Sequence, residues 1–215
     1  NASVTIVPQQ DHKKRLDIAD INELAGTKAY NCSDYETACS YFGIAMSLLP
    51  TDHWKCLYKL SHRLSFLWAK SAYACGDMEK ARSITHEIIK ECHCIEDKIA
   101  SYYLLATIQF DCGELSATYS TCVAVLTQLG ENIPSSIDQR DAAAMIRDTF
   151  ILVNDITDTK LLEMKEMDNK ISICMKFYTN LVRVAHSTQP TLKAFIGCRM
   201  VQLTMEHGIC SHSII

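Results

Sequence analysis

Apolar residues recur along this chain at the three- and four-residue spacing of amphipathic helices. This spacing runs through one stretch after another, and Gly or Cys-Ser turns separate most of them. The stretches before Pro134 are 16–31, 34–49, 52–75, 78–91, 95–111 and 115–129. Three later ones cover 141–153, 171–184 and 191–207. The pattern predicts a chain that is nearly all helix.

Three of the predicted helix pairs share one arrangement of small residues. The aligned small positions in the second helix of each pair are Ala38, Ala81 and Thr118, which lie 43 and 37 residues apart. Paired helices at such a period are typical of solenoids, in which each unit buries its apolar face against its neighbours. The repeat therefore predicts an all-α solenoid of antiparallel helix pairs. Its defining residues are Gly26, Tyr35, Ala38, Phe42, Ala45, Pro50, Gly76, Ala81 and Gly113.

The ends of several predicted helices carry capping residues. Ser33 and Glu36 have the spacing of a capping box, in which Ser33 accepts from the backbone and Glu36 reaches back to it. Thr51 or Asp52 is placed to cap one long helix that reaches Cys75. Gly76 and Asp77 then end that helix and begin the next, because glycine adopts the left-handed conformation and aspartate caps helix starts.

The chain divides into three expected regions. Residues 1–15 read as a leader or linker, and 16–134 as three helix pairs. Residues 135–215 continue with less regular pairs, in which an apolar turn follows the helix 141–153 and the last two helices meet around Pro190. The apolar residues of that turn are Leu161, Leu162, Met164 and Met167. Because the chain begins at Asn1 without methionine and ends at the apolar Ile215, we expect a piece of something longer.

Composition and charge exclude several classes of partner. The chain of 215 residues is 48% apolar and 21% charged, with a net charge of −4, so it can bury a core and lacks a basic nucleic-acid footprint. The basic cluster His12–Arg15 is short and is interpreted as solvated. The uncharged stretch 99–110 has twelve residues, too few to cross a bilayer. Neither nucleic acid nor membrane is expected as a partner.

Eleven cysteines raise the question of disulfides or metal. Their number is odd, and several occupy small apolar positions of the repeat, where a free thiol behaves as a small hydrophobe. These are Cys39, Cys75, Cys112 and Cys122. A reducing, cytoplasmic location is the simpler interpretation, and the glycosylation sequon at 31–33 is then unused. The tightest ligand cluster, His86 with Cys92–Cys94, has no second pair of ligands, so no metal is expected.

No pattern of a catalytic or cofactor site is present in the sequence. Phosphate-binding and dinucleotide-binding glycine motifs and a nucleophile elbow are absent, and His86-Glu87 is followed by Lys90 where a zinc protease motif needs histidine. Glu206 and His207 are adjacent on a helix and point in different directions. Glu163 and Glu166 lie among lysines and are interpreted as a solvated face. We expect no catalytic residue and no cofactor.

The repeat-defining residues from Gly26 to Pro50 resemble a tetratricopeptide repeat. The run 41–54 further resembles the helical repeat region that follows the NTPase module in large signalling proteins, which join AAA-type ATPase, serine/threonine kinase-like, GAF and histidine kinase domains. Segments 76–81, 129–134 and 199–208 fit in the same order, whereas Thr118, Cys122 and His93 depart from the pattern and leave the repeat boundaries open. The resemblance implies a right-handed superhelix, with the catalytic domains outside this chain.

The groove of such a superhelix is the expected binding surface. Co-chaperone domains of this family clamp a carboxylate with basic and amide residues on the first helices, but the matching positions here offer only Lys70. A carboxylate clamp is therefore not expected. The alignment exposes Phe66 and Tyr103, and the candidate partner contacts are Phe66, Lys70, Tyr103 and Thr107. Other aromatics at helical spacing, such as Trp54, Tyr58 and Trp68, are more typical of core.

Two functions remain open from the sequence. The favoured one is a non-catalytic scaffold or regulatory segment of a multidomain ATPase–kinase signalling protein, whose partners are the neighbouring NTPase, GAF or kinase domains. The alternative is a free-standing repeat adaptor that binds a peptide or protein. Neither function assigns an enzymatic activity to these residues.

Overall fold

The structure, a computed structural model, describes residues 9–134, 136–154, 156–157, 159, 161, 163–188 and 190–213. Within these residues the secondary structure is helical apart from one isolated bridge, so the predicted all-α class is confirmed. Leu162 and Ile215, which figured in the sequence predictions, lie outside the described residues, as do residues 1–8. The chain forms two compact units, one up to Leu104 and one from Leu105.

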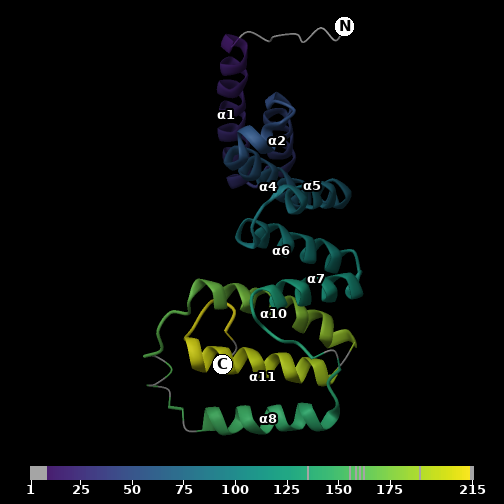
Figure 1. The fold of residues 1–215 in the computed structure, drawn as a ribbon, viewed down its shortest axis with the longest axis vertical. Coiled ribbons are helices and arrows are strands. Elements are labelled where there is room, and N and C mark those ends of the chain that lie inside the picture. The colour runs from purple at the N-terminus through teal and green to yellow at the C-terminus, as the bar shows by residue number, and fades with distance from the viewer. Residues whose placement is uncertain are drawn as a thin grey trace. The chain divides into compact units, whose positions relative to one another are not determined.

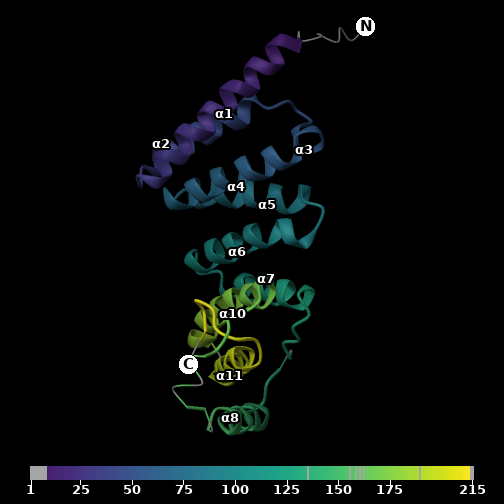
Figure 2. The same ribbon diagram turned by 90° about the vertical axis from the view of Figure 1, so that its left-hand side faces the viewer.

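The first unit is a succession of packed helices (Figures 1 and 2). α1 contacts α2, α2 contacts α4, and α4 contacts α5. The helices are α1 (Gln9–Asn31), α2 (Tyr35–Leu48), α3 (His53–Cys56), α4 (Tyr58–Ala74), α5 (Met78–Glu91) and the first part of α6 (Ile95–Asp111). The bounds predicted for 78–91 and 95–111 are confirmed.

Successive helices are joined by the same turn in three places. In the α1–α2 turn the Ser33 N–H donates to the carbonyl of Tyr30 at 2.9 Å, and the Asp34 N–H donates to that of Ala29 at 3.0 Å. These two bonds define a Schellman motif, whose penultimate residue is left-handed. Equivalent bonds close the α4–α5 and α6–α7 turns, where Gly76 and Gly113 have φ of 82° and 77°.

Three predictions from the sequence are wrong. Ser33 does not cap α2: its φ is 62°, and the Asp34 side chain instead accepts from the Thr37 N–H. The expected single helix 52–75 is interrupted at Leu57, which separates α3 from α4. Cys75 and Cys112 are exposed beside the turns rather than buried as small apolar residues. In addition, α1 begins at Gln9, so residues 9–15 of the expected leader are helical.

The core of the first unit is built on Phe42. Its ring is fully buried, and a Cβ added to Gly26 would lie 2.9 Å from a ring carbon. The absence of a side chain at Gly26 therefore lets the ring approach the backbone of α1. The buried residues of this cluster are Ala19, Ala38, Phe42, Ala45, Leu49 and Leu64. Ala38, Phe42 and Ala45, three of the repeat-defining residues, therefore lie in this core.

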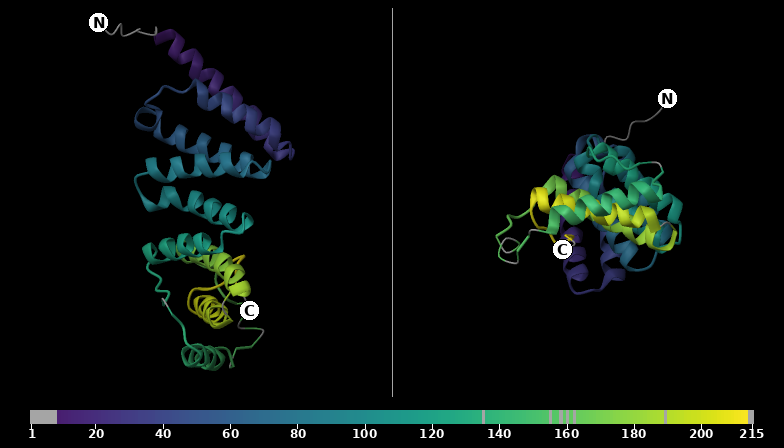
Figure 3. Two further views of the ribbon diagram at one scale, coloured as in Figure 1. Left: turned by 90° about the vertical axis from the view of Figure 1, so that its right-hand side faces the viewer. Right: turned by 90° about the horizontal axis from the view of Figure 1, so that it is seen from below.

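The second unit packs its helices around α10 and α11 (Figure 3). α10 contacts α7 and α11, and α11 contacts α8. Besides the end of α6, the unit contains α7 (Leu115–Gln128), α8 (Gln139–Asn154), α10 (Asn169–Thr188) and α11 (Pro190–His207). The predicted pairing of the last two helices is confirmed, and Met167 of the predicted apolar turn is buried.

The segment after α11 folds back onto the residues before α10. The Met167 N–H donates to the carbonyl of Ile209, and the Ile209 N–H donates to that of Lys165, both at 2.9 Å. This bridge passes directly over Gly208, whose φ is 102°. A Cβ at this position would lie 2.1 Å from the Lys165 carbonyl oxygen. Only glycine fits there.

We expect Gly208→Ala to lower the free energy of unfolding of the second unit by about 2 kcal/mol, because it combines a left-handed alanine with the loss of the bridge. Urea denaturation followed by far-UV circular dichroism measures this change. Gly197→Ala is the matched control, since a Cβ on Gly197 in α11 meets no atom within 4 Å. That variant should be more stable by about 0.5–1 kcal/mol. If Gly208→Ala and Gly197→Ala changed the free energy of unfolding equally, the close approach of the Lys165 carbonyl to Gly208 would be contradicted.

Candidate functional site

An apolar groove lies between α8 and α11 in the second unit. It encloses about 420 Å³, and its walls are almost entirely hydrocarbon and sulfur. The lining residues are Ile146, Thr149, Phe150, Val153, Ile156, Leu161, Cys198, Val201 and Met205. Concave apolar surfaces of this size are the usual form of binding sites.

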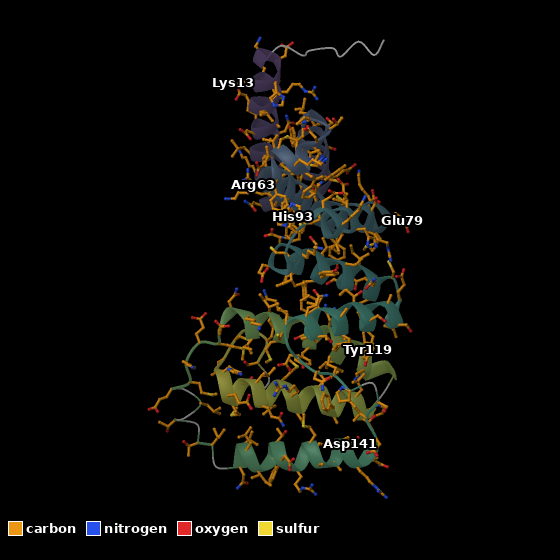
Figure 4. The ribbon with its side chains drawn as sticks, in the orientation of Figure 1. Lys13, Arg63, Glu79, His93, Tyr119 and Asp141 are labelled. Carbon is orange, nitrogen blue, oxygen red and sulfur yellow. The ribbon has the colours of Figure 1, made fainter. Side chains whose placement is uncertain are left out.

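Helical spacing places the groove residues on facing stripes. Residues 146, 149, 150 and 153 repeat at three and four residues on α8, and 198, 201 and 205 do so on α11. Gln202 joins the two helices, because its amide nitrogen donates to Thr149 Oγ1 at 2.9 Å. Thr149 and Ala142 anchor α8 and are only 7% and 5% exposed. The start of α8 is marked by Asp141 in Figure 4.

The groove leaves large apolar side chains in contact with water. Phe150 is 64% exposed and Ile146 is 51% exposed. Both lie on α8, whose neighbouring Ile151 and Leu152 are also exposed but do not line the groove. Contiguous exposed apolar surface of this kind marks an interaction site rather than ordinary solvent-facing helix.

A half-buried ion pair fixes the wall formed by α11. Arg199 donates from Nε and Nη2 to the two carboxylate oxygens of Glu131, each at 2.9 Å, and the Tyr178 hydroxyl donates to Glu131 Oε2 at 2.6 Å. Burial alone would raise the pKa of Glu131, but the hydrogen bonds from Arg199 and Tyr178 outweigh it, and the pKa is lowered. The loop after α7 is thereby tied to both α10 and α11.

A polar cluster in the first unit includes His93, one of the four residues that were weighed above as metal ligands. Tyr58 stacks on His93 with ring centroids 5.1 Å apart, and its hydroxyl donates to Asp97 Oδ2 at 2.6 Å. That hydrogen bond lowers the pKa of Asp97, while burial and the same bond raise the pKa of Tyr58. His62 Nε2 lies 2.8 Å from the Asp97 carbonyl oxygen. The cluster therefore fastens the start of α6 to α4.

These residues are not arranged as a metal site. Cys92 is buried beside Tyr58, whereas Cys94 and His93 are exposed. In the part of the chain that the structure describes, no three His, Cys, Asp or Glu side chains are placed to hold a metal ion.

A second hollow, of about 750 Å³, lies at the turn end of the first two hairpins. Its polar residues include Asp34 and Asp77, which accept from the backbone N–H groups of Thr37 and Lys80 at 3.2 Å. Each carboxylate therefore caps its own helix rather than forming an acid–base pair with the other. The hollow is a consequence of the repeated turn.

The four contacts predicted from the repeat alignment are only partly exposed. Phe66 and Tyr103 are half-buried, in contrast to the exposure expected for them. Lys70 is exposed, and its ammonium lies 4.8 Å from the ring centroid of Tyr30, so α4 holds it against α1. Thr107, on α6, belongs to the second unit. Their role as partner contacts stays a prediction.

Comparisons with protein-family models, curated proteins and solved structures give no match. No described helix is both long and apolar enough to cross a membrane. The site must therefore be judged from its own chemistry.

Sequence reasoning missed the α8–α11 groove. The available signal was the run Phe150–Val153, four consecutive apolar residues in a helix that buries only one stripe. Such a run places apolar side chains all around the helix, and some of them must remain exposed unless another element covers them. The facing stripe on α11 could not be assigned, because nothing local relates residues about fifty positions apart.

Proposed function

We propose that this chain is a non-catalytic helical-repeat scaffold that binds a protein segment in the α8–α11 groove. The observation that carries the proposal is the exposure of Phe150 above a groove lined almost wholly by apolar atoms. A groove of this kind accepts the apolar face of an amphipathic helix, with anchors spaced three, four or seven residues apart.

The repeated turns support a tetratricopeptide-like solenoid as the scaffold. Three turns use the same pair of backbone hydrogen bonds and the same left-handed residue, at Ser33, Gly76 and Gly113. Ala38 and Ala81 are fully buried at equivalent places after the first two turns. We propose that the antiparallel pairs continue as a right-handed superhelix, as the resemblance implies.

The larger context that we propose is a multidomain ATPase–kinase signalling protein located in the cytoplasm. Its support is the order of the matching segments from Gly26 to Gly208. All eleven cysteines are free thiols in the structure, which suits a reducing compartment. A reading frame with a phosphate-binding loop upstream and a GAF or kinase domain downstream would support this context, whereas a frame ending near these residues favours a free-standing adaptor.

The groove is tested with a display library of amphipathic helical peptides. We expect enriched peptides to carry apolar anchors on one face and to lose at least about 30-fold in affinity for Phe150→Glu, because a charge in the groove removes its central apolar contact. Fluorescence anisotropy of a labelled peptide measures the affinity.

Ile151→Glu is the matched control, since Ile151 is 65% exposed on the same helix but does not line the groove. The affinity of the Ile151→Glu variant for the peptide should stay within about twofold of that of the wild-type chain. Failure to enrich any helical peptide, or equal binding by wild type and Phe150→Glu, would refute the groove as the binding site. Nucleotide turnover by the pure chain would instead refute its non-catalytic character.

A further inference from the structure

The outer face of α1 carries an uncovered apolar seam. Ile18 and Ile21 are 47% and 63% exposed, and Ala25 is half-buried. Together with the charged residues before and after them on the same face, these residues follow one another at alternating intervals of three and four positions. Such intervals are typical of the seam of a coiled coil. From the N-terminal end the seam residues are Asp11, Lys14, Ile18, Ile21, Ala25 and Lys28.

The N-terminal part of α1 projects beyond its neighbour within the first unit. Arg15 reaches the carbonyl of Ser47 at the end of α2, and the residues before it have no helix beside them (Figure 2). Residues 11–15 are all exposed, including Lys13, which is labelled in Figure 4. Helical turns without packing are marginal in water. A helix that covers the seam would also stabilise this projecting end.

Only one antiparallel register makes the seam complementary to itself. When Ile18 of one copy lies opposite Ile21 of the second copy, Lys14 falls opposite Ala25 and Asp11 falls opposite Lys28. The two-fold symmetry gives every pairing twice, so four isoleucines meet at the centre with an acid–base pair at each end. Shifting the register by one seam layer places Ile21 opposite Lys14 in one direction and Lys14 opposite Lys28 in the other.

We propose that two copies of this chain associate through α1, antiparallel and about a two-fold axis between Ile18 and Ile21. The projecting residues 9–15 of each copy then pack along the C-terminal half of α1 in the other. Asp11 and Lys28 are free for this contact, since neither forms an ion pair with any described residue. The surface is separate from the α8–α11 groove and does not depend on its function.

Analytical ultracentrifugation of the whole chain tests the association. We expect the mass to rise from the 24.2 kDa of one chain toward twice that value as the concentration rises to about 100 µM. Ile21→Glu should raise the dissociation constant at least 100-fold, because the charge is introduced twice in one interface. Ile151→Glu, with nearly the same exposure at 65%, should leave the dissociation constant within about twofold of wild type.

A charge exchange tests the register. Asp11→Lys and Lys28→Asp should each weaken association about tenfold, because each places like charges opposite one another twice. The double variant restores opposite charges and should recover most of the wild-type dissociation constant. Circular dichroism checks helix content, since the exchanged charges oppose the dipole of α1.

Three results would overturn the proposal. They are a wild-type chain that remains monomeric at about 100 µM, a dimer that tolerates Ile21→Glu, and a double charge variant no better than its single parents. A monomeric wild-type chain would mean that a helix other than a second α1 covers the seam. A double charge variant no better than its parents would mean that any dimer has a different register. None of the three changes the affinity expected for a peptide in the groove.

Discussion

Phe42→Ala is expected to lower the free energy of unfolding of the first unit by about 3–5 kcal/mol. The ring is fully buried between α1 and α2, where it packs on the bare backbone of Gly26. Removing it leaves a cavity in a cluster whose other buried members are Ala19, Ala38, Ala45, Leu49 and Leu64. The loss combines the transfer free energy of the ring with the cost of the cavity that it leaves.

Tryptophan fluorescence during urea denaturation isolates this effect. Both tryptophans of the chain, Trp54 and Trp68, belong to the first unit, so the signal reports that unit alone. Tyr41→Ala is the control, because Tyr41 precedes Phe42 on the same helix but is 36% exposed. We expect it to cost less than about 1 kcal/mol. A loss below 1 kcal/mol for Phe42→Ala would show that the Gly26 contact does not hold the first two helices together.

The sequence predicted helix pairs well where one residue decides the local geometry. Gly76 and Gly113 end helices because only glycine adopts positive φ without strain, and both were assigned correctly. The same reasoning failed at the first turn, where Ser33 takes the left-handed conformation. Ser33 was interpreted as a cap because its spacing to Glu36 fits a capping box, while the adjacent Asp34 was the stronger competitor for the same N–H groups.

The contacts that shape the candidate site join residues too distant for any sequence pattern. Glu131 and Arg199 are 68 positions apart, and Thr149 and Gln202 are 53 apart. Periodicity identified the helices that carry them but not which faces meet. The exposure of the seam on α1 could not be predicted from the sequence either. An apolar stripe on a helix has the same pattern whether a neighbouring helix covers it or not. Burial, rather than pattern, distinguishes the surfaces that remain for partners.

Arg199→Met is expected to lower the free energy of unfolding of the second unit by about 3 kcal/mol at neutral pH. Side chains at Arg199 and Glu131 are 27% and 10% exposed, so removing the guanidinium leaves a nearly buried carboxylate without its bidentate partner. Far-UV circular dichroism during urea denaturation measures the loss. Arg147→Met is the control, because Arg147 is 71% exposed and its ion pair with Asp148 is loose at 3.9 Å. It should cost less than about 0.5 kcal/mol.

The cost of Arg199→Met should depend on pH in a defined direction. Because the pKa of Glu131 is lowered in the folded protein, its contribution is complete above the ordinary carboxyl value of 4.5 and is lost as the pH falls through the lower folded value. In the variant, burial persists without the guanidinium, so the pKa of Glu131 rises and protonation relieves the unpaired charge. Wild type and variant should therefore converge in acid. Adding Glu131→Gln should recover part of the loss at neutral pH, because the amide oxygen still accepts from Tyr178. A cost independent of pH, or no recovery in the double variant, would show that Arg199 acts by packing rather than by neutralising Glu131.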